Sequence, residues 1–83
     1  MKHVDFLETQ SDGSQEVLAT VWLVDNKLRT KGNRAFITSM GIRRGYPIAG
    51  GKMLKPKDGD AFLNGLSRAF SGSMIRATEP YDD

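Results

Sequence analysis

Three short stretches near the amino end are rich in apolar and β-branched residues and lie between turn residues, which predicts β-strands. The first stretch covers residues 4–7, the second 16–24 and the third 27–30. In the second stretch both alternating sets are largely apolar, which predicts a central strand covered at least in part on both faces. Asp25 and Asn26 separate the last two stretches and tolerate the positive φ that a two-residue hairpin turn requires.

Two helices are predicted from apolar residues that recur every three or four positions. Asn33 is typical of an N-cap and Gly41 of a helix stop, so a helix of about two turns is expected between them. Asp58 is expected to cap a longer helix with an apolar face over residues 62–70, and Gly72 is expected to end it. The large apolar residues at predicted core positions are Trp22, Phe36, Met40, Phe62 and Phe70.

The stretch between the two predicted helices, residues 42–57, is rich in glycine and proline. It is therefore predicted as a long loop, with a brief extended piece at residues 52–54. A loop of this length in a small domain is usually functional or mobile, which makes it a candidate binding segment.

The carboxyl end predicts one more strand over residues 73–78, with Ile75 and Ala77 facing inward, and a solvated tail over residues 79–83. The predicted order is therefore strand, strand, strand, helix, loop, helix, strand. This order predicts a single α+β domain spanning residues 1–83, in which a small antiparallel sheet of about four strands carries two helices on one face.

Composition excludes several classes of function. The chain has 83 residues, 39% of them hydrophobic, and no cysteine, which excludes disulfides, thiolate catalysis and cysteine-ligated zinc. The single histidine, His3, lies near the amino end, so the serines lack a plausible base and we predict no enzymatic activity, metal or cofactor. The longest apolar run, residues 17–24, is too short for a membrane span, and no secretory leader is visible. We therefore expect a cytoplasmic protein without a membrane partner.

Charge is strongly segregated along the chain, although the formal net charge is only +2. Residues 1–26 and 58–83 are each acidic overall, whereas residues 27–57 contain nine basic residues and no acidic one. This basic segment predicts a surface for a polyanion, because lysine and arginine replace the counterions of a phosphate backbone. The residues expected to make these contacts are Lys31, Arg34, Arg43, Arg44, Tyr46, Lys52, Lys55 and Lys57.

Two parts of this set have a more specific expectation. Arg43 and Arg44 lie close to Tyr46, a pattern that suits phosphate contacts beside an aromatic ring stacked on an unpaired base. Lys31 and Arg34 flank the predicted start of the first helix, where free N–H groups favour an anion.

The leading hypothesis is a small non-enzymatic binding module that contacts nucleic acid or a ribonucleoprotein through residues 27–57. One alternative is a protein-interaction module, such as a small regulator or inhibitor, that docks its basic loop on an acidic protein surface. Another is a small subunit of a larger assembly. The oligomeric state stays open, since the predicted strand over residues 27–30 offers an edge for pairing but carries basic residues that discourage it.

The last third of the chain contains the pattern Pro-x-Asp-Gly-x-x-Phe-Leu-x-x-Leu, which begins at Pro56 and ends at Leu66. An Arg-Ala pair, Arg76 and Ala77, follows in the predicted closing strand. In these features the chain resembles a group of small uncharacterised bacterial proteins. The resemblance implies the helix and the strand and no particular function.

Overall fold

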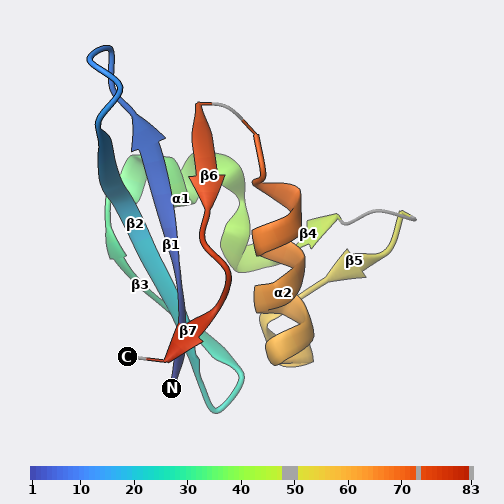
Figure 1. The fold of residues 1–83 in the computed structure, drawn as a ribbon. Coiled ribbons are helices and arrows are strands. Elements are labelled where there is room, and N and C mark those ends of the chain that lie inside the picture. Colours follow the sequence, from blue (N-terminus) through green and yellow to red (C-terminus); the bar gives the residue numbers. More distant parts are fainter. Residues whose placement is uncertain (48–50, 73, 83) are drawn as a thin grey trace.

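An antiparallel sheet forms one layer of the protein, and the helices pack against one of its faces (Figure 1). The computed structural model describes residues 1–47, 51–72 and 74–82. The spatial order of the strands is β3-β2-β1-β6, with β7 also pairing with β1. The predicted α+β fold is confirmed, with one strand more than expected. The strands are β1 (Lys2–Thr9), β2 (Gln15–Val24), β3 (Lys27–Gly32), β6 (Ile75–Ala77) and β7 (Tyr81–Asp82).

Tight turns join the first three strands. Asp25 and Asn26 have φ angles of +51° and +60°, the left-handed pair that a two-residue hairpin turn requires, as predicted. In the β1–β2 turn, Ser14 donates hydrogen bonds to Asp12 Oδ1 from its hydroxyl at 2.6 Å and from its backbone N–H at 2.9 Å. The hydroxyl bond and then the backbone bond lower the pKa of Asp12, because both stabilise the charged carboxylate.

Alternation along the strands divides the sheet into an inner face, toward the helices, and an outer face. The inner face is buried and includes Val4, Phe6, Ala19, Val21 and Ala77. His3, Asp5 and Trp22 alternate with these residues on the outer face and are only partly buried. The prediction that Trp22 is a core residue was therefore wrong. β2 is central, as predicted, but its outer-face side chains are only partly buried and neither α-helix covers them. An apolar pattern on both sides of a strand does not reveal whether a second layer exists to cover it.

The first helix, α1 (Arg34–Met40), has the predicted caps. Asn33 Oδ1 accepts a hydrogen bond from the Phe36 N–H at 3.0 Å. At the other end Gly41 adopts φ +65°, and its N–H donates to the Thr38 carbonyl. Only Ile37 of this short helix is fully buried, so α1 depends on packing against the sheet for its stability.

The second helix, α2 (Asp60–Ala69), begins and ends at other residues than predicted. Its N-cap is Gly59, and the Asp58 carboxylate instead accepts a hydrogen bond from the Lys55 N–H at 2.7 Å. Asp58 thus caps the short 3-10 turn η2 (Pro56–Asp58), because the positive φ of Gly59 separates this turn from the helix. Phe70 is the C-cap, so Gly72 lies beyond the helix end. No helix in the described part of the chain is long and apolar enough to cross a membrane.

The predicted loop over residues 42–57 is largely regular where the structure describes it; residues 48–50 lie outside the described residues. It contains the 3-10 turn η1 (Ile42–Arg44) and a small hairpin of β4 (Tyr46–Pro47) and β5 (Met53–Leu54). The expected extended piece thus corresponds to β5. A Cβ atom at Gly45, which has φ +111°, would lie 2.7 Å from the Leu54 carbonyl oxygen, so the close approach of the two segments requires glycine.

Part of the predicted solvated tail pairs with the sheet, so it is not a free tail, although most of its described residues are exposed as expected. Tyr81 and Asp82 form β7 opposite His3 and Lys2 of β1, although both β7 side chains stay exposed. Tyr81 Oη also donates a hydrogen bond to Asp5 Oδ1 at 2.9 Å. This pairing satisfies backbone groups at the start of β1 that β6 does not reach. A strand of only two residues is too short to be predicted from its hydrophobic pattern. Ser73 and Asp83, at the ends of the predicted strand and tail, lie outside the described residues.

Phe70 joins the sheet to the rest of the core. Its ring centroid lies 5.0 Å from that of Phe6 in an edge-to-face arrangement and 5.0 Å from that of Tyr46. Phe36 of α1 lies 5.3 Å from Phe6. Rings from β1, α1, β4 and the end of α2 therefore form one cluster, in which each aromatic pair adds about 0.5–1.5 kcal/mol beyond area burial.

We expect Phe70→Ala to lower the free energy of unfolding by about 3–5 kcal/mol, because it removes these ring contacts and leaves a cavity. Urea denaturation followed by far-UV circular dichroism measures the loss, and Phe70→Leu is expected to lose less. The control is Met74→Ala at a side chain that is 68% exposed, where the change should stay within about 0.5 kcal/mol. A loss below about 1 kcal/mol for Phe70→Ala would show that the cluster does not hold the layers together.

Candidate anion-binding site

Three segments that are distant in the sequence meet beyond one end of β3 and border a shallow hollow of about 370 Å³. They are the β2–β3 turn with the start of β3, the turn η1, and the segment that enters η2. We call this site the basic hollow. The residues that line it are Asn26, Lys27, Leu28, Arg43, Arg44, Lys55, Pro56 and Lys57.

Each segment reaches the basic hollow for a local reason. The hairpin turn places Lys27 at the first position of β3. Gly41, in its left-handed conformation, ends α1 and turns the chain directly into η1, whose last two residues are arginines. Pro56 opens η2, and the hydrogen bond from the Lys55 N–H to the Asp58 carboxylate closes that turn. Short, capped turns therefore hold the basic side chains on fixed backbone.

The lining carries a strong positive charge. Five of its eight residues are lysine or arginine, all five are exposed, and none of the eight is acidic. Within residues 1–47, 51–72 and 74–82, none of the five cations forms an ion pair with a carboxylate. Arg43 Nη2 donates a hydrogen bond to Thr30 Oγ1 at 2.8 Å, which ties Arg43 to β3 but leaves its charge unneutralised. Such a group favours an anion that takes several charge-assisted hydrogen bonds.

Acidic side chains gather in a neighbouring hollow of about 520 Å³, which shares Asn26 with the basic one. Asp25, Asp58 and Asp60 are among the residues that line it. Lys2 and Met1, which carries the terminal amino group, also line it, so the excess of negative charge in this hollow is small.

The structure brings together half of the predicted contact residues. Arg43, Arg44, Lys55 and Lys57 all line the basic hollow. Lys27 also lines the hollow, although it was not among the predicted contact residues. Its position directly after the predicted hairpin turn could have indicated it. The other predicted residues, which lie outside this hollow, are Lys31 on β3, Arg34 at the start of α1, Tyr46 on β4 and Lys52 before β5.

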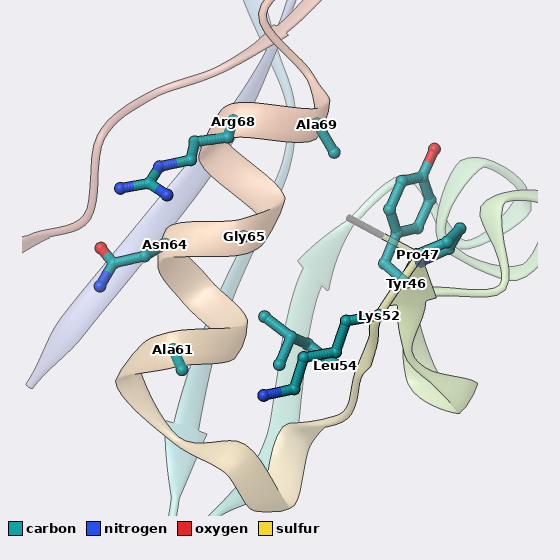
Figure 2. A pocket seen from close by; sticks show the side chains of 9 residues that line it. All are labelled: Tyr46, Pro47, Lys52, Leu54, Ala61, Asn64, Gly65, Arg68 and Ala69. Atoms are coloured by element: carbon teal, nitrogen blue, oxygen red, sulfur yellow. The ribbon is translucent and has the colours of Figure 1, made fainter. Parts of the chain in front are cut away.

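Tyr46 and Lys52 border a separate groove of about 750 Å³ between α2 and the β4–β5 hairpin (Figure 2). The Tyr46 ring is partly buried and packs against Phe70, so less of it remains for the predicted stacking on a base. Figure 2 shows Asn64 and Arg68 projecting from α2 away from Tyr46. The two charged side chains of this groove come from opposite sides of it, Lys52 from the hairpin and Arg68 from α2.

Comparison of the chain with protein-family models, with curated proteins and with solved structures finds no match. The resemblance to small bacterial proteins therefore stays a prediction. Among the described residues, no group of three or more histidine, cysteine, aspartate or glutamate side chains is placed to hold a metal ion. The function is accordingly argued from the chemistry of the site itself.

Removing one cation from the basic hollow is expected to leave stability unchanged or slightly higher at low salt, because the five cations repel one another. For Lys57→Gln the free energy of unfolding should change by no more than about 0.5 kcal/mol. The difference should vanish near 1 M salt, where the screening length is about 3 Å. Urea denaturation at both salt concentrations measures it.

The control for this prediction is Arg68→Gln, at an exposed arginine in the last turn of α2. It is expected to lower stability slightly, because a cation there interacts favourably with the helix dipole. A loss of more than about 1 kcal/mol for Lys57→Gln would assign Lys57 to maintaining the fold rather than to ligand contact.

Proposed function

We propose that this protein is a small non-enzymatic binding module that contacts nucleic acid or a ribonucleoprotein through the basic hollow. The observation that carries the proposal is that five basic residues from three chain segments line one hollow and that no acidic residue lines it. Clustered lysine and arginine bind phosphate backbones because they release condensed counterions. The contacts are expected to be to sugar and phosphate, so this site would bind many sequences alike.

The composition of the lining favours a phosphate backbone over an acidic protein surface. Five of the eight lining residues are basic and none is aromatic, although aliphatic parts of these side chains supply most of the surface of the hollow. Centres of protein–protein interfaces are usually apolar and rich in aromatic residues, whereas backbone phosphates require mainly charge and hydrogen-bond donors. An acidic protein partner is therefore treated as an outcome of the test.

Fluorescence anisotropy with labelled single-stranded RNA, single-stranded DNA and duplex DNA tests the proposal, at low and near-physiological salt. We expect binding to at least one of them that survives near-physiological salt. The double variant Arg44→Glu/Lys57→Glu should weaken it by at least about tenfold, because two attractive phosphate interactions are replaced by repulsion. The dependence of log K on log salt should also become shallower, by about one for each phosphate that the variant no longer neutralises.

The matched control is Arg34→Glu/Lys52→Glu, which makes the same change in net charge outside the basic hollow. It is expected to weaken binding much less than the Arg44/Lys57 variant. Equal losses in the two variants would show that overall charge, and not the hollow, binds the ligand. If no nucleic acid binds at near-physiological salt, the proposal fails and an acidic protein partner becomes the leading candidate.

A further inference from the structure

The outer face of the sheet carries a row of side chains that crosses four strands. Strand register places Tyr81 of β7 opposite His3 of β1, His3 opposite Trp22 of β2, and Trp22 opposite Arg29 of β3. Residues that pair directly across an antiparallel sheet point to the same face. Three aromatic rings and one guanidinium therefore lie in line on the face that the helices leave uncovered.

The three rings form a partly exposed platform. The His3 and Trp22 centroids are 5.1 Å apart with an interplanar angle of 35°, and those of His3 and Tyr81 are 5.9 Å apart at 28°. The His3 and Tyr81 rings are stacked and the His3 and Trp22 rings are tilted against each other, so the ring edges and the outer faces of the two end rings remain for a ligand. Tyr81 is 38% exposed, and His3 and Trp22 are partly exposed. Partly exposed aromatic rings on a β-sheet are suited to stacking on unpaired bases, because every base offers a π-face.

The edge strand β3 links this platform to the basic hollow. Lys27, Arg29 and Lys31 pair with outer-face residues of β2, so all three cations belong to the outer face, and all are exposed. Lys27 also lines the basic hollow, and it lies only about 7 Å along the strand from Arg29. On the same face the Asp5 carboxylate already accepts hydrogen bonds from Thr20 at 2.6 Å and from Tyr81 at 2.9 Å. The path from hollow to platform is therefore predominantly basic.

We propose that the outer face stacks unpaired bases of a strand whose phosphates occupy the basic hollow, so that the ligand is single-stranded nucleic acid. This inference rests on the proposed function and narrows its ligand class. Three cations beside the aromatic row favour an anionic ligand over a second copy of the chain, which would bring the same three cations to the interface. A duplex keeps its bases stacked inside and offers the platform nothing to bind.

The single tryptophan of the chain, Trp22, allows a direct test in the unmodified protein. Its fluorescence is followed while the protein is titrated with oligothymidylate of about twelve nucleotides, a length typical of single-strand sites, and separately with an abasic oligonucleotide of equal length. We expect oligothymidylate to quench the emission and the abasic backbone to leave it nearly unchanged. We also expect oligothymidylate to bind at least about fivefold more tightly, from the contribution of stacked bases.

Three variants complete the test, with labelled oligonucleotides and circular dichroism to verify folding. Trp22→Ala is expected to reduce the affinity for oligothymidylate to nearly that for the abasic backbone, whereas Trp22→Phe keeps a ring and should retain most of the difference. Arg44→Glu/Lys57→Glu should weaken binding of both oligonucleotides, because both carry the same phosphates.

The outcomes separate this inference from the proposed function. The platform proposal would be overturned if the two oligonucleotides bound with equal affinity and neither quenched Trp22. If the Arg44/Lys57 variant then bound neither oligonucleotide, the proposal for the basic hollow would stand. Failure of both oligonucleotides, of single-stranded RNA and of duplex DNA to bind would overturn both proposals. Dimers in sedimentation velocity, with Trp22 emission that shifts on dilution, would assign the outer face to a second copy and overturn the platform.

Discussion

The pairing of β1 with strands on both of its sides is the constraint on which the rest of the structure depends. On one side β1 pairs with β2, and on the other with β6 and β7. Its alternation sends Val4 and Phe6 into the core and leaves His3 and Asp5 on the outer face. A shift of one residue in the register of β1 would exchange these two sets of side chains. Burial of Phe6 against Phe36 and Phe70 therefore also determines that His3 lies on the outer face.

The acidic and the basic side chains differ in the interactions that they make within the fold. Asp12 and Asp58 are committed to local hydrogen bonds in turns, where a carboxylate stabilises free N–H groups. The five basic residues of the hollow form no ion pair with a carboxylate among the described residues, so their mutual repulsion is expected to oppose folding slightly. Proteins retain unfavourable arrangements of this kind chiefly at functional sites, where a ligand supplies the missing charge.

β3 belongs to both proposed contact regions because it is an edge strand. Its first residues line the hollow, and its outward side chains extend the row of Trp22. Lys27, Arg29 and Lys31 also discourage another strand from pairing with this edge, since charge along an exposed strand opposes aggregation. The same three residues therefore protect the edge and provide a basic path between hollow and platform.

The sequence alone determined the elements that depend on near neighbours: the strand over residues 16–24, the turn at Asp25 and Asn26, and a first helix capped by Asn33 and Gly41. It also determined that residues 27–57 carry nine basic residues and no acidic one. The tertiary structure decided which cations share a hollow, placed Trp22 on an uncovered face, and paired Tyr81 with β1. The physical reason is the separation in sequence of the interacting residues, because caps and turns form hydrogen bonds between residues only a few positions apart. Burial and sheet register depend on contacts between residues far apart in the chain.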